Sequence, residues 1–505
     1  MFKRTHYDAI IVGSGATGGW AAKTLTEAGM HVLVLEAGRS RRWMQTQRLF
    51  ERVRNKAGYL IENDHRAVSR QCIQAQCYAW RHDPHAFVDD ADNPYTTPEE
   101  KPFTWIRARQ VGGRAMVRGH GLHFYRFSDY DFKAASGDGF GVDWPIDYSD
   151  LEPFYDRVER FIGLVGNADN IAQLPNPIPG AHIGITSAER HLQAKLAERW
   201  PDRKLITRRT APPPLPIAAA RVTGRLTLRT EAVAREILVD ADTGRARGVS
   251  WLERGQERYA SARVVVLAAS TIESARLLLN SCSHQHPEGL GNSSGTVGCY
   301  LMDHTHIFGG VESTMPLPAS KLKADESWSY VPQFRNVKEK QPGFLRGYGV
   351  QVLTMGNQCH LDAFGEMLPR ATNRITIDPV RKDRWGIPSA RISCEHSDNE
   401  RAQAKDAMTE CREMLTEAGF DLKPGDPKLG TPGLAIHECG TARMGSDAKT
   451  SVLNAYNQSW DVKNLFVVDG ACFVSQGVQN PMLTMMAIAL RASERIVDLC
   501  RRYEL

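Results

Sequence analysis

The sequence predicts an α/β protein (α+β overall) in which a Rossmann-like, doubly wound nucleotide-binding domain is interrupted by a second domain built on an antiparallel sheet. Three observations predict this fold class. A glycine-rich turn joins a β-type run to a helical pattern near the N-terminus. Two further strand–turn–helix patterns stand in the middle and near the end of the chain. Between them lie stretches whose apolar residues alternate, as is typical of antiparallel strands.

The first element is the glycine-rich turn. A short apolar run leads into Gly13, Gly15 and Gly18, which are spaced as GxGxxG, and a helical pattern follows. Gly13 permits a tight turn, Gly15 lets the backbone approach a pyrophosphate, and Gly18 lets the helix pack closely on the strand. The helix start offers N–H groups to phosphates, so Ala16 and Thr17 belong to the predicted phosphate site.

The second strand ends in an acid. Gly29 stands where the first helix is expected to end, and the run HVLVLE that follows ends in Glu36. Glu36 is expected to accept hydrogen bonds from the adenosine ribose hydroxyls, and an acid there disfavours a 2′-phosphate. The nucleotide is therefore predicted to be FAD or NAD rather than NADP. This context favours a nucleotide site over a plain glycine-rich turn.

The composition argues against several function classes. The net charge is only +5 over 505 residues, and no basic stripe with interleaved aromatics occurs, so no nucleic-acid partner is expected. No apolar run reaches the length of about 18 residues that a membrane span needs. The apolar run before Gly13 is too short for a signal peptide, so we expect a cytoplasmic protein, with export alongside a partner subunit left open.

The ten cysteines show no spacing typical of a metal or redox site. No CxxC pair occurs, and we expect mainly buried thiols in a reducing compartment. The sequence leaves open whether Cys72 and Cys77 pair.

Three further stretches are predicted to contact the nucleotide. Adjacent Gly112 and Gly113 let the backbone pass close to a flat or charged group. Residues 263–281 are typical of a strand, a small-residue turn and a helix. Near the C-terminus a strand is expected over 465–468, followed by Asp469 and Gly470, and a helix is expected to begin near Pro481.

These motifs, in this order, resemble the glucose–methanol–choline (GMC) oxidoreductase superfamily of FAD-dependent alcohol oxidases and dehydrogenases. The resemblance implies FAD as the cofactor and a GMC, p-hydroxybenzoate hydroxylase-like fold. Residues 139–166 and 373–393 further resemble the bacterial sugar-oxidising branch, which includes glucoside 3-dehydrogenases and pyranose oxidases. The motifs that carry the resemblance are the first glycine turn with Glu36, RARQVGG, LAASTIESARLLLNS, VGCYLMDH, HECGTARMG and NLFVVDGACF…NPMLT.

The resemblance implies two catalytic residues. Oxidising an alcohol requires a base for the hydroxyl proton and a donor that holds the same oxygen. GMC enzymes place a histidine in the motif written here as HECGT, and a histidine or asparagine just before the last helix. His437 is thereby implied as the base and Asn480 as its partner. Without the family, His437 is typical of a core histidine and Asn480 of a helix N-cap.

The resemblance also implies the FAD contacts, of which some are expected to serve packing only. A covalent flavin link is not expected, because Val117 stands where pyranose oxidases carry the linking histidine; FAD is therefore predicted to be non-covalent and dissociable. The predicted cofactor-binding residues are Gly13, Gly15, Ala16, Thr17, Gly18, Glu36, Arg109, Gly112, Gly113, Met116, Val233, Ala268, Ala269, Glu273, Asp469, Gly470, Pro481, Met482, Leu483 and Thr484.

No metal is expected. Asp303, His304 and His306 look like a ligand triplet, but LMDH is a structural turn in the family. Two features that follow the second glycine stretch concern the shape of the substrate pocket. His120 and His123 are interpreted as part of the next segment, and Arg118-Gly119 stands where sugar-oxidising relatives often carry Trp-Gly.

The nucleotide signals divide the chain. Residues 1–128, 205–310 and 431–505 are predicted to form a discontinuous FAD-binding domain. Residues 129–204 and 311–430 are predicted to form the substrate-binding domain, whose sheet would cover the flavin.

Three details of this organisation are also predicted. Residues 43–102 look loop-rich, typical of a lid or a subunit contact. Residues 397–420 show an amphipathic helix with a Ser-x-x-Glu start and a glycine stop. Four aromatic residues of the substrate domain are candidates to stack on a sugar ring, although core packing is the commoner role for such residues: Trp328, Tyr330, Phe334 and Tyr348.

The predicted function is FAD-dependent oxidation of a secondary alcohol of a sugar, glycoside or aminocyclitol to a ketone, with the C3 hydroxyl of a glucoside as the first candidate. A dehydrogenase is favoured over an oxidase. The alternatives are a pyranose 2-oxidase or C-glycoside 3-oxidase that uses O₂, a non-sugar GMC alcohol dehydrogenase, a flavin-binding scaffold without turnover, and a nicotinamide dehydrogenase. The electron acceptor (O₂, quinone or cytochrome) and the assembly (homo-oligomer or small partner subunit) stay open.

Overall fold

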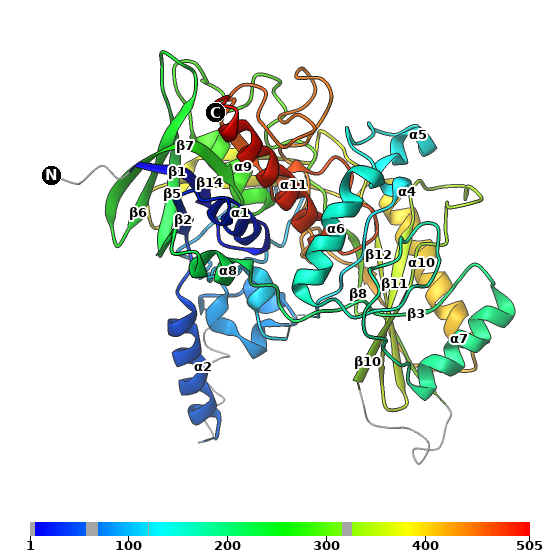
Figure 1. Cartoon of the computed structure of the whole chain (residues 1–505). Helices are drawn as coiled ribbons and strands as arrows, with labels where there is room; N and C mark the ends of the chain where they lie inside the picture. Colours follow the sequence, from blue (N-terminus) through cyan, green and yellow to red (C-terminus); the bar gives the residue numbers. More distant parts are fainter. Residues whose placement is uncertain (1–5, 57–68, 120, 316–325) are drawn as a thin grey trace.

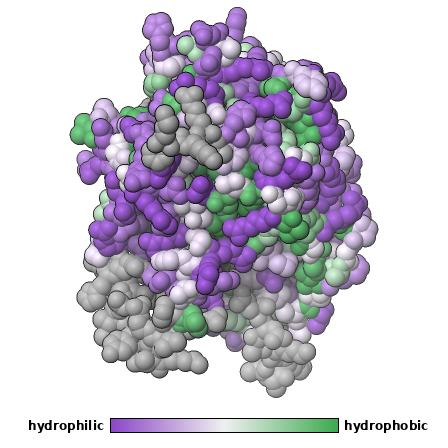
Figure 2. Space-filling model, turned by 60° about the vertical axis from the view of Figure 1, so that its left-hand side comes forward, coloured by the Kyte–Doolittle hydropathy of each residue, from purple (hydrophilic) through white to green (hydrophobic). Residues whose placement is uncertain are grey.

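The computed structural model describes residues 6–56, 69–119, 121–315 and 326–505. Two large sheets organise the molecule (Figure 1). The first sheet carries the N-terminal glycine turn, with α1 and α11 beside it, and the second lies against α10. Figure 2 shows hydrophilic residues over most of the face that it presents, with hydrophobic residues gathered near the middle.

The first sheet is mainly parallel where it carries the nucleotide turn. Its strands follow the order β4-β2-β1-β7-β6-β5, and β17 pairs with the end of β7. The parallel strands are β1 (His6–Val12), β2 (Val32–Glu36), β4 (Leu226–Thr230), β7 (Gln256–Leu267) and β17 (Leu465–Val467). The inner ones are almost wholly apolar and buried, as parallel strands covered on both faces usually are. The antiparallel strands β5 (Ala232–Val239) and β6 (Ala246–Glu253) extend the sheet, which the sequence patterns had not indicated.

Helices cover this sheet. α1 (Ala16–Glu27) packs on β1, β2 and β7, and α11 (Met482–Arg501) and α8 (Pro216–Val222) pack on α1. α9 (Thr271–Asn280) follows β7, as the strand–turn–helix pattern predicted. α6 (Tyr148–Ile162) packs on α11, so this helix of the predicted substrate domain lies with the nucleotide-binding part.

The second sheet is antiparallel and follows the order β15-β9-β12-β11-β10-β3, with β8 and β16 beside it. One face packs on α10 (Asp398–Glu417), whose Ser397 capping box and following Gly419 match the predicted start and stop. α7 (Ser187–Arg199) contacts α10. The strands are β3 (Ile206–Thr207), β8 (Thr305–Phe308), β9 (Val311–Thr314), β10 (Glu326–Val331), β11 (Tyr348–Met355), β12 (Gln358–Gly365), β15 (Asp421–Leu422) and β16 (Lys428–Leu429).

Strand alternation divides this sheet into a core face and a cavity face. Along β11 the residues Val350 and Val352 point into the core beneath α10, whereas Gln351 and Leu353 line the large cavity described below. The same alternation runs through the neighbouring strands, because successive side chains of a strand point to opposite faces. The second sheet therefore serves as one wall of the cavity.

Several expectations differ from the structure. The segment 43–102 is not only loop, because α2 (Arg41–Lys56) runs through its start and projects from the body in Figure 1. β13 (Arg374–Lys382) and β14 (Pro388–Ser393) form a separate two-stranded sheet that contacts α9, instead of joining the second sheet. β3 and β8 join the second sheet, although both lie inside 205–310.

The short helical elements complete the described chain. They are η1 (Gln74–Gln76), η2 (Trp80–His82), η3 (Pro84–Ala86), η4 (Arg114–Met116), α4 (Asp129–Phe132), α5 (Ala134–Asp138) and η6 (Gly470–Cys472).

Three of the four aromatic residues proposed to stack on a sugar are core residues. Phe334 and Tyr348 belong to the apolar cluster beneath α10, and Tyr330 stacks on Tyr125 with ring centroids 4.5 Å apart. Only Trp328 of this group lines the cavity, because it lies on the cavity face of β10 and beyond the buried tyrosine pair.

All ten cysteines are free thiols, with Cys72 exposed and Cys77 buried. Among the helices of the described residues, none combines the length and the apolar character needed to cross a bilayer.

Candidate active site

A cavity of about 1140 Å³ runs between the glycine turn of the first sheet and the cavity face of the second. Its walls come from segments far apart in the sequence, including the turns after β1 and β7, the stretch 105–115, the motif around His437 and the start of α11. The volume exceeds that of most sites for drug-sized ligands, which suits an extended dinucleotide together with a small substrate.

The glycine turn forms one end of this cavity. Gly13 has a φ of 102°, and a Cβ there would lie 2.1 Å from the carbonyl oxygen of Ala268. Gly15 and Gly113 approach so closely that a Cβ on Gly113 would lie 2.8 Å from the Cα of Gly15. No side chain caps α1, so its first N–H groups are left to a ligand such as a phosphate.

Glu36 lies at the end of β2 in the cavity wall. Its carboxylate accepts hydrogen bonds from the Ser14 N–H (3.1 Å), the Ser14 hydroxyl (2.5 Å) and the Gly38 N–H (2.7 Å). Burial raises the pKa of Glu36 above its usual value. Sequence analysis missed Ser14, whose hydroxyl also accepts from the Gly112 N–H at 3.2 Å and so joins the two glycine stretches.

Arg109 and Glu273 form an ion pair in the wall, with Arg109 Nη2 2.7 Å from Glu273 Oε1. Burial by itself would raise the pKa of Glu273, but the charges of Arg276, Arg109 and Arg107 outweigh it and lower that pKa to about 2. Glu273 is therefore charged at neutral pH and holds the loop 105–109 against α9.

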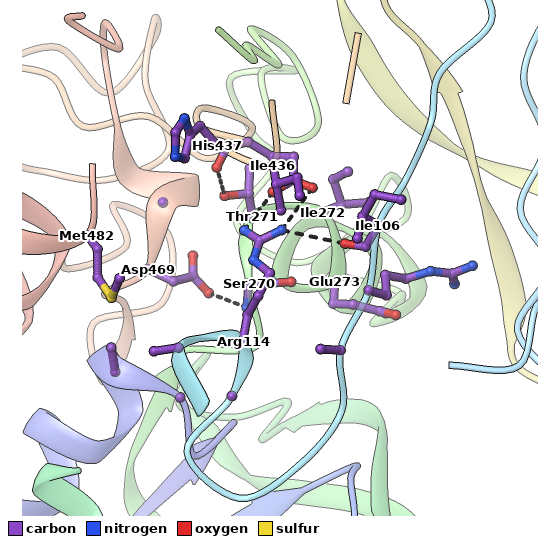
Figure 3. Close-up of a pocket in the computed structure, with 18 of the residues that line it drawn as sticks. Ile106, Arg114, Ser270, Thr271, Ile272, Glu273, Ile436, His437, Asp469 and Met482 are labelled. Carbon is purple, nitrogen blue, oxygen red and sulfur yellow. Dashed lines mark hydrogen bonds and ion pairs between the residues drawn. The ribbon is translucent and has the colours of Figure 1, made fainter. Parts of the chain in front are cut away.

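Asp469 follows β17 and supports the turn after β7. Its Oδ2 accepts from the Ser270 N–H (3.0 Å) and the Ser274 hydroxyl (2.5 Å), and its Oδ1 accepts from the Ala471 N–H (3.0 Å). Burial raises the pKa of Asp469 to about 6. Figure 3 shows Asp469 bonded to Ser270, whose φ of 85° is held in place by this contact.

Five of the predicted cofactor-binding residues do not line the cavity. Gly18 packs inside the turn, where a Cβ would lie 2.1 Å from the Gly13 carbonyl oxygen. Leu483 and Thr484 are fully buried, because only one face of the first turn of α11 reaches the cavity. The other two are Gly112 and Met116, which pack against each other behind the turn at 113–115.

The other predicted cofactor-binding residues line the cavity together: Gly13, Gly15, Ala16, Thr17, Glu36, Arg109, Gly113, Val233, Ala268, Ala269, Glu273, Asp469, Gly470, Pro481 and Met482.

Arg114 is a cavity residue that sequence analysis did not single out. In Figure 3 it lies in the middle of the drawn residues, with a dashed line to Ile106. Its Nη2 donates to Glu438 Oε2 at 2.8 Å, and the Glu438 side chain is almost fully buried. This pair ties the second glycine stretch to the residue that follows His437.

His437 and Asn480 meet in the cavity wall. Asn480 Nδ2 lies 3.1 Å from His437 Nε2, although the two residues are far apart in the sequence. Pro481 is the N-cap of α11 and makes no side-chain cap, so the Asn480 side chain is turned to the cavity instead of capping the helix. The carboxamide oxygen of Asn480 accepts from Gln351 Nε2 at 3.3 Å, which orients the amide with its NH₂ towards His437.

A second histidine sets the proton position of His437. His304 Nε2 lies 2.9 Å from the carbonyl oxygen of Gly477, which only accepts, so this nitrogen carries a proton. Burial lowers the pKa of His304 to about 4, so the ring is neutral and its Nδ1 is an acceptor. His437 Nδ1, 2.9 Å away, must therefore donate to it. We assign neutral His437 as the Nδ1–H tautomer, with Nε2 unprotonated and facing Asn480.

The backbone of His437 is also held. Asp303 accepts from the N–H groups of Gly433, Ala435 and His437 at 2.7, 3.2 and 2.9 Å. Burial and the nearby charge of Glu438 raise the pKa of Asp303. Gln476 Nε2 donates to the His437 carbonyl at 2.7 Å. The sequence offered Asp303 and His304 only as a ligand-like pair within a structural turn, whereas their contacts make them supports of His437.

The remaining candidates fall in different places. His123 lines the cavity, whereas His120 lies outside the described residues. Val117 is buried beside Ile106 in a separate apolar cluster. Arg118 donates its N–H to Asp83 at 3.2 Å and does not line the cavity. Within the described part of the chain, no three His, Cys, Asp or Glu side chains are grouped to hold a metal ion.

Comparison with known proteins decides the family. Residues 216–306 and 369–489 match the N- and C-terminal family models described as GMC oxidoreductase. The chain belongs to the GMC oxidoreductase family. It is thus an oxidoreductase that acts on CH–OH groups, and FAD is the cofactor of the family. The uncapped α1 terminus, the glycine cradle and the buried Glu36 fit that cofactor.

Three relatives match the GMC chain over nearly its whole length. It is 28% identical to 2-methyl-1,2-propanediol dehydrogenase of Mycolicibacterium austroafricanum, over 97% of this chain and 95% of the relative. It is 24% identical to the fructose dehydrogenase large subunit of Gluconobacter japonicus (97% and 98%). It is 26% identical to paromamine 6'-oxidase of Streptomyces fradiae (98% and 92%).

A solved structure shows the same fold. Formate oxidase of Aspergillus oryzae aligns over 99% of both chains with a TM-score of 0.68 at 13% identity. The GMC fold expected from the motifs is thereby confirmed.

Proposed function

We propose that this protein oxidises a secondary alcohol of a sugar, glycoside or aminocyclitol to a ketone, with the C3 hydroxyl of a glucoside as the first candidate. The unprotonated Nε2 of His437 beside the Asn480 amide carries the proposal, because this pair presents one acceptor and one donor to the same small space in the FAD cavity. The names of the relatives, which cover a diol, a sugar and an aminoglycoside, support a hydroxyl-bearing substrate.

The chain's own residues then perform the proton chemistry. The substrate hydroxyl donates to His437 Nε2 while its oxygen accepts from Asn480 Nδ2, which fixes the direction of the carbinol carbon. His437 takes the hydroxyl proton as general base and keeps its Nδ1–H bond to neutral His304. When bound, FAD supplies the acceptor for the hydride that leaves the carbinol carbon. Gln351 keeps the Asn480 amide from turning over during this step.

FAD is proposed to be held without a covalent bond. The glycine turn and the start of α1 would hold the pyrophosphate, Glu36 the adenosine ribose, and the stretch around Gly113 the flavin. Val117, at the position where pyranose oxidases carry the linking histidine, is a buried aliphatic residue that offers no nucleophile.

A dehydrogenase is favoured over an oxidase, and the electron acceptor is O₂, a quinone or a cytochrome. The relative from Gluconobacter is a large subunit, which supports assembly with a further subunit. Turnover measured with O₂ and with an artificial quinone or dye separates the two classes. A faster reaction with O₂ would favour the alternative of a pyranose 2-oxidase or C-glycoside 3-oxidase.

The central test is anaerobic bleaching of the flavin absorbance in the FAD-loaded protein, against a panel of glycosides, sugar acids, aminoglycosides and simple diols. We expect at least one sugar-derived compound to reduce the flavin. His437→Ala should keep FAD and lose the bleaching, whereas His284→Ala, an exposed histidine outside the cavity, should bleach as the wild type does. Flavin that stays oxidised with every compound would contradict the proposal.

A further inference from the structure

The cavity face of the second sheet carries two rows of side chains at different distances from the catalytic pair. The inner row holds Gln351 and its cross-strand neighbour Asp362, and Gln351 donates to Asn480. The outer row holds Trp328, Leu353 and His360, which are direct neighbours across β10, β11 and β12. The two rows are two residues apart along β11, which is about 7 Å.

Arg208 extends the outer row. Its N–H donates to the Trp328 carbonyl at 3.3 Å, so it continues the line of β3 beside Trp328, and it lines the cavity. The strand alternation separates it from Arg209, which is fully buried and bonded to Asp169 Oδ2 at 3.2 Å. Arg208 is half-buried, and within the described part of the chain no carboxylate lies at ion-pair distance from it.

The surroundings of Arg208 leave its charge uncompensated. His123 is only 4% exposed, and burial together with the Arg208 charge lowers its pKa to about 4, so it is neutral. Its Nδ1 has no hydrogen-bond partner in the described structure, and its ring lies edge-on to Trp328 at 5.5 Å. The acid of the inner row, Asp362, already pairs with His306 Nε2 at 2.9 Å.

We propose that Arg208 binds a carboxylate of the substrate, so that the preferred substrate is a sugar acid or an acidic glycoside. This inference rests on the proposed function and adds the charge of the substrate to it. One guanidinium fork matches one carboxylate through two parallel hydrogen bonds, and the aromatic surroundings strengthen the attraction. Arg208 is offset from Gln351 by about 7 Å along the strands and by two strand spacings, about 10 Å, across them, so the carboxylate would lie at the opposite end of the substrate from the hydroxyl held by His437 and Asn480.

The proposal also selects against cationic substrates. An ammonium group in the outer row would meet the like charge of Arg208 at short range, and Asp362 of the inner row is already paired with His306. Aminocyclitols, which the proposed function alone allows, are therefore expected to bind worse than neutral glycosides of the same size.

The test compares D-gluconate with D-glucitol, which differ by a carboxylate in place of a CH₂OH group. Each is titrated under anaerobic conditions into the FAD-loaded protein, and the dissociation constant is read from the perturbed flavin spectrum, or from competition where the flavin is reduced. We expect gluconate to bind about ten- to a hundredfold more tightly than glucitol, which is the range for a charge-assisted hydrogen bond. This preference should weaken as salt is added.

Matched variants locate the effect. Arg208→Gln should abolish the preference while keeping FAD and the affinity for glucitol, and Arg208→Lys should keep part of it. Arg221→Gln, at an exposed arginine on α8 outside the cavity, should leave the preference intact. Equal binding of the two probes by the wild type, no response to gluconate, or a preference that survives in Arg208→Gln would each overturn the inference. Failure of the proposed function looks different, because then no hydroxyl compound of any charge reduces the flavin.

Discussion

At the scale of single residues, the site depends on where two protons lie. A carbonyl that can only accept holds a proton on His304 Nε2, and burial keeps that ring neutral, so His437 must donate from Nδ1. The imidazole that we propose as the base is thereby fixed as a hydrogen-bond acceptor at Nε2 before any substrate binds. A histidine left without this neighbour would divide its proton between two nitrogens.

This assignment predicts different outcomes for two substitutions of His304. His304→Leu removes the acceptor for the His437 Nδ1–H, and we expect flavin reduction to slow by about 10²- to 10⁴-fold, the usual loss when general-base catalysis fails. His304→Gln keeps an acceptor for His437 and a donor for Gly477, and should recover most of the rate. Stopped-flow reduction across pH is the measurement, and KM should change little in both variants. Equal rates in the two variants would show that His304 serves packing alone.

The buried residue His396, outside the cavity, makes the stability of the fold depend on pH. It is 6% exposed, and burial lowers its pKa from the ordinary 6.5 to about 4. Between these values the unfolded chain binds a proton that the folded chain does not, so this residue weakens folding as pH falls from about 6.5 to 4, by about 1.4 kcal/mol for each pH unit. Above pH 6.5 the effect vanishes.

His396→Gln removes that titration. The unfolding free energies of wild type and variant are compared at pH 7 and pH 4.5, so that the cost of the substitution itself cancels. We expect the unfolding free energy of the variant, relative to that of the wild type, to be higher at pH 4.5 than at pH 7. A difference that is the same at both values would mean that His396 titrates normally in the folded protein.

At the scale of elements, the first strand, turn, helix and second strand were predictable because each has a local cause. The glycines, the helix stop at Gly29 and the acid at the end of β2 all act within a few residues. The pairing of β13 with β14 apart from the second sheet was not predictable, since alternation marks a strand but not its partner. Gln351 and Arg208 were missed for the same reason, because only the register of the sheet shows which face lines the cavity.

The packing of α1 on the turn before it is so close that a single added methyl group should disturb the FAD site. Gly18→Ala would place a Cβ about 2.1 Å from the Gly13 carbonyl oxygen, so the helix must shift from the strand. We expect FAD affinity to fall by about tenfold or more, measured from flavin fluorescence on dilution. Gly137→Ala, on a short exposed helix where the added Cβ meets nothing, is the matched control. Unchanged FAD binding in Gly18→Ala would show that the turn can relax without loss of the cradle.

At the scale of the whole molecule, the family and the fold followed from motifs spread along the chain, because a long cofactor must be contacted from many segments. His437 and Asn480, which the resemblance implied as the catalytic pair, lie side by side although they are distant in sequence. Leu483 and Thr484 are buried away from the cavity, because a motif marks a whole stretch of helix, whereas only one side of that helix reaches the cavity.

The mode of FAD attachment is a property of the assembled protein. Acid or guanidinium unfolding should release all the flavin into solution, because Val117 offers no nucleophile. Absorbance of the soluble fraction and peptide mass spectrometry check this. Flavin retained on a peptide, most informatively one containing His82 or His123 of the cavity wall, would contradict non-covalent binding.

The proposed reaction depends on two contacts: His437 removes the hydroxyl proton, and Asn480 holds the oxygen. Single-turnover flavin reduction, measured anaerobically at saturating substrate in wild type, His437→Ala and Asn480→Ala, tests it most directly. We predict that both variants bind FAD normally, that His437→Ala slows reduction by about 10²- to 10⁴-fold, and that Asn480→Ala slows it less. Reduction of the flavin at the wild-type rate in His437→Ala with FAD fully bound would show that His437 is not the base.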